Sequence, residues 1–140
     1  MKIQDLLKEL DELNLPANQY AIVSSGVMAI YGIRDANDLD VVTTDQLWDK
    51  LAKTYKVTPP PRCERIKVGN VEFLGEGSMW QNPKIATPDE LINSADIIDG
   101  HRYIKLEYVK AIKATRADPK DLTDIELIDK YLTSRNALDG

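Results

Sequence analysis

Two aspartates, one residue apart, are the residues of this chain whose type and spacing most directly suggest chemistry. Asp38 and Asp40 flank Leu39 at the start of an apolar run that is typical of a strand. Strand side chains alternate between two faces, so both carboxylates point the same way, about 6–7 Å apart along the strand. Two like charges at that distance are costly to hold without a cation, and Mg²⁺ prefers oxygen ligands. We therefore predict that Asp38 and Asp40 hold Mg²⁺ or the similar ion Mn²⁺.

A short turn that precedes the aspartates suggests a phosphate site. Ser25 and Gly26 follow an apolar strand predicted over residues 20–24 and come just before a short predicted helix, with 11 residues between Gly26 and Asp38. Backbone N–H groups at the start of a helix bind anions such as phosphate. A phosphate site this close to a metal site indicates phosphoryl or nucleotidyl transfer.

The run 22–42 resembles the nucleotidyltransferase superfamily, whose best-known member is DNA polymerase beta. In that family a small-residue turn, a spacer and an acidic-apolar-acidic triplet follow one another, as Ser25-Gly26 and Asp38-Leu39-Asp40 do here. Ser25 stands where the family usually has its first glycine. Arg34, which follows Gly32 at a distance of two residues, is similar to a Gly-x-Arg segment of small prokaryotic members. Many of those members belong to toxin–antitoxin or phage-defence systems.

The resemblance implies a fold and a reaction. The fold would be α+β, a nucleotidyltransferase-like mixed β-sheet with helices packed on one side. The reaction would be Mg-dependent transfer of a nucleoside monophosphate from a nucleoside triphosphate (NTP) to a hydroxyl group of RNA, a protein or a small molecule. Ser25 and Gly26 would bind phosphate, and Lys113 or Arg34 would neutralise developing charge. The alternatives are an inactive protein of this fold that binds nucleotides or a toxin or antitoxin partner, and an interaction module in which the aspartates pair with arginines.

The same resemblance implies a third carboxylate on a later strand. Glu72 is the best match, because it lies between apolar residues in the second half of a hairpin predicted around Gly69-Asn70. Glu76 is the competitor, although it lies in a glycine-containing loop. Glu72 can also be interpreted as an ordinary solvent-facing strand residue.

A basic helix near the end of the chain resembles the C-terminal signature of the small nucleotidyltransferases. That signature has a helix lysine, then Lys-Asp and a further aspartate, which Lys113, Asp121 and Asp124 match in order. The family's usual arginine is two positions away from Arg116. We interpret Asp121 as the N-cap of a following helix and Asp124 as a first-turn residue favoured by the helix dipole.

The remaining pattern predicts the elements that position these residues. Apolar residues at helical spacing predict helices over residues 3–13, 45–55 and 106–115, the second capped by Thr44 or Asp45. Thr87 and Glu90 form a predicted capping box, Asp99-Gly100 a hairpin turn, and Pro59–61 an extended connector. The apolar stripe of the first helix is assigned to the core, with a dimer seam as the alternative.

Composition bounds the class of protein. A chain of 140 residues with a net charge of −5 is expected to form one domain, 1–140, with a core over about 20–132, and to lack the overall basicity of a general nucleic-acid binder. The single cysteine, Cys63, excludes an internal disulfide. With no long apolar run and no signal-peptide pattern, we expect a cytoplasmic protein that does not bind a membrane.

Overall fold

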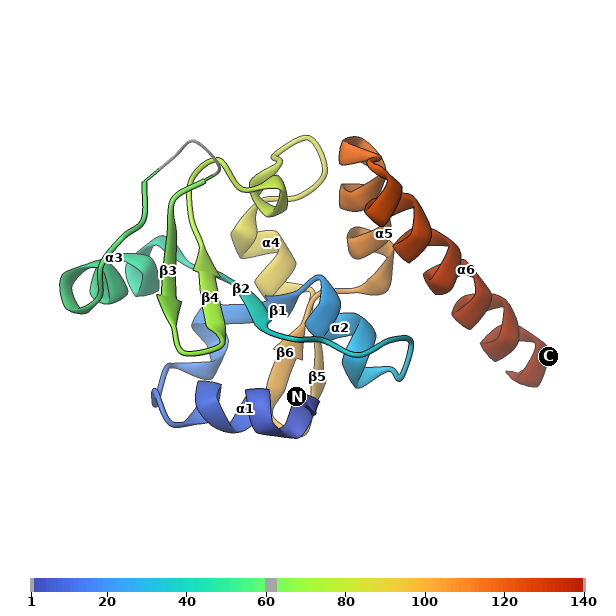
Figure 1. Cartoon of the computed structure of the whole chain (residues 1–140), viewed down its shortest axis with the longest axis horizontal. Helices are drawn as coiled ribbons and strands as arrows, with labels where there is room; N and C mark the ends of the chain where they lie inside the picture. Colours follow the sequence, from blue (N-terminus) through green and yellow to red (C-terminus); the bar gives the residue numbers. More distant parts are fainter. Residues whose placement is uncertain (1, 60–62, 140) are drawn as a thin grey trace.

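The computed structural model describes residues 2–59 and 63–139, so that most of the connector predicted at Pro59–61 lies outside the described residues. Helices and strands follow one another along the whole chain (Figure 1). Their bounds are α1 (Ile3–Asp11), the 3₁₀ turn η1 (Ala17–Gln19), β1 (Tyr20–Val23), α2 (Ser25–Ile30), β2 (Leu39–Thr43), α3 (Asp45–Thr54), β3 (Arg65–Val68), β4 (Val71–Leu74), η2 (Met79–Gln81), α4 (Pro88–Asn93), β5 (Asp96–Ile98), β6 (His101–Tyr103), α5 (Leu106–Arg116) and α6 (Pro119–Asp139).

The described strands form one mixed sheet in the order β3-β4-β2-β1-β6-β5. β1 runs antiparallel to β2, whereas β2 runs parallel to β4, and β1 runs parallel to β6. Both parallel pairs join strands that are distant in sequence, because parallel neighbours need a crossover connection. The predicted α+β class with a mixed sheet is therefore confirmed.

The centre of the sheet is buried on both faces. All four residues of β1 are buried, and β2 buries Leu39 and Val41 on the face against which α2 packs. Gly26 makes this packing close, because a Cβ there would lie 2.5 Å from Cγ2 of Ile22 and 2.9 Å from Cδ2 of Leu39. α1 contacts α2 and β4, while α4 contacts β1 and β2. The sheet thus gives β2 a rigid position in the middle of the core.

The local signals for turns and caps agree with the structure. The Thr87 side chain and Glu90 form a reciprocal capping box at the start of α4, and Thr44 caps α3 by accepting a hydrogen bond from the backbone N–H of Leu47. Gly69 has a φ of 62° in the turn between β3 and β4. Asp99 and Gly100, with φ of 49° and 83°, form the turn between β5 and β6. These turns have the conformation that favours glycine and aspartate.

Several helix boundaries differ from the prediction, those of α3 and α5 by one residue at the C-terminal end. α1 ends at Asp11, before the predicted limit at residue 13. α6 begins at Pro119, because the side chain of Asp118 accepts a hydrogen bond from the backbone N–H of Asp121 at 3.0 Å. The N-cap is therefore Asp118, and the assignment of Asp121 as the N-cap was wrong. Proline at the first helical position is favourable because its missing N–H has no intrahelical partner there.

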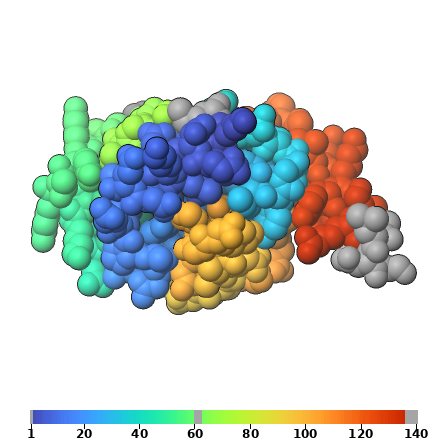
Figure 2. All heavy atoms as spheres, turned by 90° about the horizontal axis from the view of Figure 1, so that it is seen from below, coloured from blue at the N-terminus to red at the C-terminus, as the bar shows by residue number. Residues whose placement is uncertain are grey.

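The molecule is elongated, with α3 at one end and α6 at the other (Figure 1). Figure 2 shows the face on which α1, in dark blue, lies beside α2, in light blue, with the β5–β6 segment in yellow and orange next to both. α6 packs along α5, and its C-terminal part extends away from the sheet (Figure 1). Among the described residues, each helix is too short or too polar to cross a membrane.

Candidate active site

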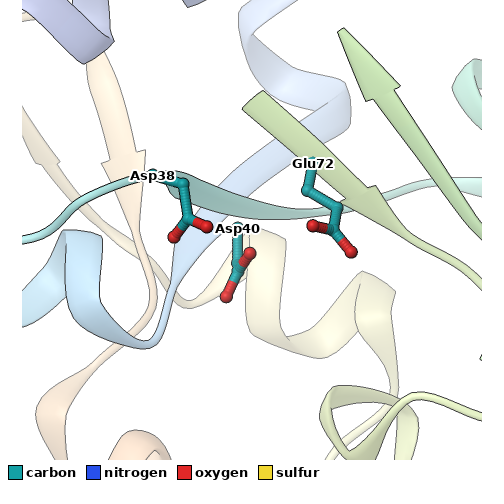
Figure 3. Close-up of side chains that lie close together, drawn as sticks. All are labelled: Asp38, Asp40 and Glu72. Carbon is teal, nitrogen blue, oxygen red and sulfur yellow. The ribbon is translucent and has the colours of Figure 1, made fainter. Parts of the chain in front are cut away.

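Two neighbouring parallel strands bring three carboxylates together. Asp40 of β2 lies in register with Glu72 of β4, and Asp38 comes directly before β2. One oxygen from each of Asp38, Asp40 and Glu72 lies within 4.8 Å of the others. The three side chains point to the same side of the sheet (Figure 3). We call this group the acidic triad.

The acidic triad has the chemistry of a divalent-cation site. Each side chain is half-buried, so that the charges are partly removed from water while they repel one another. A compact set of carboxylate oxygens suits Mg²⁺ or Mn²⁺, which accept oxygen ligands and retain waters and substrate phosphates in their shell. The donor set therefore fits the predicted ion.

The structure places Glu72, and not Glu76, beside the two aspartates. Glu76 is exposed in the loop after β4 and lines a separate, smaller cavity with Trp48. Glu72 also faces a cation of its own, because Nε of Arg65 lies 3.6 Å from its Oε1. Glu72 is therefore more than a solvent-facing strand residue, because its side chain is largely buried between charged groups.

The turn after β1 brings serine side chains to the same cleft. Ser24 and Ser25 both line it, and Ser25 is buried as the first residue of α2. The left-handed backbone falls on Ser24, with a φ of 58°, and not on Ser25, where the family's glycine was expected. Gly26 is absent from the cleft wall, and its lack of a side chain serves the packing of α2 on the sheet.

A buried lysine faces the triad from the other side of the cleft. Lys113 on α5 is 4% exposed, and its Nζ lies 3.0 Å from Oδ2 of Asp124 and 3.6 Å from Oδ1 of Asp121. The same Nζ lies 5.9 Å from the centre of the Trp80 ring, a distance typical of a cation–π contact. A lysine is rarely buried unless it is paired, and here two carboxylates supply that pairing.

Asp124 joins Lys113 to Arg34. Both oxygens of Asp124 accept hydrogen bonds from Arg34, from Nε at 2.8 Å and from Nη2 at 3.0 Å, while Nη1 of Arg34 donates to the backbone oxygen of Asp35. Burial would raise the pKa of Asp124, but the hydrogen bonds and charges of Arg34 and Lys113 outweigh it and hold the pKa below its ordinary value. We call Arg34, Lys113, Asp121 and Asp124 the buried network.

Asp121 has one oxygen that the buried network does not satisfy. Its Oδ2 is buried without a hydrogen-bond partner among the described residues, and the nearest cation is Nε of Arg116 at 3.6 Å. Asp121 lines the cleft, as does Arg116, which also pairs with Asp118 at 2.8 Å. An unsatisfied buried oxygen in a cleft is suited to accept a hydrogen bond from a bound molecule.

Sequence reasoning underestimated Asp121 and Asp124, which it assigned to the start of a helix. Both side chains are buried, as is Ile128 on the next turn of α6. The spacing of three and then four residues places Asp121, Asp124 and Ile128 on one face of a helix. A carboxylate pair in line with an apolar residue was the available signal that this face packs against another charged group.

The acidic triad, the two serines and the buried network except Asp124 line one cleft of about 460 Å³. Its remaining wall comes from the segment that includes η2, where Trp80 is buried and Met79 is half-buried. Trp80 belongs to the core. The cleft is large enough for a small ligand, since such sites are typically ~300–1,000 Å³.

Comparison with known proteins leaves the resemblance as an expectation. No protein-family model matches the chain, and no curated protein matches it.

Proposed function

We propose that the protein is a Mg-dependent nucleotidyltransferase that transfers a nucleoside monophosphate from an NTP to a hydroxyl acceptor and releases pyrophosphate. The observation that carries this proposal is the convergence of the acidic triad, a serine turn and a buried lysine on one cleft. A carboxylate set that fits Mg²⁺, opposite groups able to contact anionic oxygens, is the arrangement that phosphoryl-transfer chemistry needs.

In this proposal, the position of each cleft residue determines its role. Asp38, Asp40 and Glu72 would hold the ion, which when bound would offset phosphate charge and lower the pKa of an attached hydroxyl. The Ser25 hydroxyl lines the cleft and would donate a hydrogen bond to a phosphate oxygen. Lys113 would attract the negative charge that develops on the phosphates. Asp121 would accept a hydrogen bond from the acceptor hydroxyl through its Oδ2, which accepts no hydrogen bond from the described residues.

The second candidate function is nucleotide binding without catalysis of transfer. Arg34, Lys113 and Arg116 line the cleft, and each is paired with a carboxylate of α6 or of the residue before it. Among the described cleft residues, Lys120 is the cation with no ion pair to a carboxylate. A site with so little free positive charge favours an inactive nucleotidyltransferase-like protein that binds nucleotides or a toxin or antitoxin partner.

Transfer of label from the α-phosphate of each NTP separates the two candidates. Purified protein would be incubated with Mg²⁺, labelled NTP and one acceptor at a time: RNA, the protein itself or a small polyol. The Asp38→Asn/Asp40→Asn variant is the control. Labelled product that the wild type forms and the variant does not form supports the transferase. Mg-dependent NTP binding by the wild type with no labelled product for any acceptor supports the inactive candidate.

A further inference from the structure

Arg65 contacts the acidic triad from outside the cleft. β3 pairs with β4 in antiparallel register, with Arg65 opposite Leu74 and Lys67 opposite Glu72. Residues directly opposite one another share a face of the sheet, so that Arg65, Lys67 and Glu72 all lie on the face of the triad. Glu72 lines the cleft, whereas Arg65 does not. The contact through which Arg65 can act on the acidic triad is therefore the one to Glu72.

The arginine side chain is held where it faces Glu72. Its Nη1 donates to the backbone oxygen of Cys63 at 3.4 Å, while its Nε lies 3.6 Å from Oε1 of Glu72. The exposed fractions are 27% for the Arg65 side chain and 16% for that of Glu72. A half-buried guanidinium stays charged at any pH at which the protein is folded, and water screens it only in part. Glu72 therefore has a permanent positive charge beside it.

A carboxylate shared with an arginine is a weaker ligand for a cation. The guanidinium attracts the same oxygens that would face the metal, and it also repels the incoming positive ion. Because Asp38 and Asp40 lie on β2 and Arg65 lies on the outer strand β3, this competition falls mainly on Glu72. Mg²⁺ commonly binds through one or two carboxylates together with substrate phosphates. A triad weakened at one ligand would hold the ion poorly until a nucleotide adds its own oxygens.

We propose that Arg65 is a positioning residue that holds Glu72 in the absence of a metal ion and lowers the affinity of the acidic triad for a free divalent cation. This inference rests on the proposed function, because it takes the triad as a metal site. Lys67 is the matched comparison, since it lies opposite Glu72 in register but is exposed and forms no ion pair among the described residues.

The test is the affinity for Mn²⁺ alone, measured from the electron paramagnetic resonance signal of the free ion. The variants are Arg65→Gln, Arg65→Lys, Lys67→Gln, Glu72→Gln and the double variant Arg65→Gln/Glu72→Gln. Far-ultraviolet circular dichroism in the presence of a chelator verifies that each is folded. We expect Arg65→Gln to bind Mn²⁺ about two- to fivefold more tightly than the wild type, the size typical of a partly exposed ion pair.

The other variants identify the cause. Arg65→Lys keeps the charge and should bind like the wild type, and Lys67→Gln should change the affinity much less than Arg65→Gln does. In the Glu72→Gln background, Arg65→Gln should have a much smaller effect, since the carboxylate that Arg65 competes for is gone and only its direct repulsion of the ion remains.

Three results would overturn the proposal. If the wild type binds Mn²⁺ and Arg65→Gln binds it equally or more weakly, Arg65 does not compete for Glu72, and the metal site itself stands. If Lys67→Gln tightens binding as much as Arg65→Gln, the effect belongs to overall charge. If neither the wild type nor Arg65→Gln binds Mn²⁺, the triad is not a metal site, and the proposed function fails together with this inference.

Discussion

The two sides of the cleft hold their charges in different ways. On the sheet side, the acidic triad gathers like charges whose oxygens lie within 4.8 Å of one another and are half-exposed. On the helix side, the buried network alternates opposite charges, with Asp124 between Arg34 and Lys113 at hydrogen-bond distances. Like charges gain from an added cation, whereas alternating charges are already satisfied. We therefore expect an added cation to affect the triad more than the buried network, whose ion pairs join α5 to α6.

The largest expected effect comes from breaking the buried network. Asp124→Ala leaves Arg34 and buried Lys113 without their shared carboxylate, which should lower the free energy of unfolding by about 3–5 kcal/mol. The matched control is Asp129→Ala, also on α6, which removes an exposed pair with Lys110 of α5 and should cost less than about 1 kcal/mol. Urea denaturation measures both. Equal, small losses would mean that the network does not stabilise the fold.

Substitutions in the turn after β1 test whether Gly26 serves the packing of α2 while Ser25 serves ligand binding. Gly26→Ala places a Cβ against Ile22 and Leu39 and should destabilise the protein by about 1–3 kcal/mol through overpacking. Ser25→Ala should leave the denaturation midpoint near that of the wild type but weaken NTP binding, because its hydroxyl lines the cleft. A normal midpoint for Gly26→Ala would show that α2 can move away from the sheet without cost.

Acid should weaken the buried network by protonating Asp124. The pKa of Asp124 is lower in the folded protein than in the unfolded chain, so its contribution to stability is present above about pH 4 and is lost as pH falls through the folded pKa. We expect wild-type stability to fall more steeply with acidification than that of Asp124→Asn. Denaturant midpoints measured from neutral to acidic pH verify this, and parallel curves would contradict it.

The smallest effect should come from the acidic triad without metal. Asp38→Asn/Asp40→Asn removes like charges and should raise the free energy of unfolding by roughly 0.2–1 kcal/mol in chelator. Adding Mg²⁺ should stabilise the wild type but not the variant, because only a state that binds the ion gains from it. Thermal unfolding with and without Mg²⁺ gives both results. A variant that is clearly less stable in chelator would show that the aspartates have a structural role.

The features that could be predicted from the sequence are those that depend on residues close together in the chain. Asp38 and Asp40 are two residues apart in a strand, so their common face follows from local geometry alone. The turn at Asp99-Gly100 and the capping box of Thr87 and Glu90 are local in the same sense. These were the features that the structure bears out in detail.

Features that depend on contacts between distant parts of the chain were harder to predict from the sequence. The position of Glu72 beside Asp40 requires the parallel pairing of β2 with β4, which the order of the chain does not dictate. Asp121 was assigned to a cap because a carboxylate near a helix start is common, while its burial against Lys113 depends on how α6 packs along α5. Arg34, expected at phosphate, lines the cleft, and its bonds from Nε and Nη2 to Asp124, 90 residues later in the chain, could not be predicted from local pattern.

The most direct test of the account is calorimetric titration of ATP, CTP, GTP and UTP, each with and without Mg²⁺. Wild type and Asp38→Asn/Asp40→Asn would be compared after both are shown to be folded. We predict that at least one nucleotide binds the wild type only when Mg²⁺ is present and does not bind the variant. If the folded wild type binds no nucleotide, or the variant binds as well as the wild type, the cleft is not the nucleotide site proposed here.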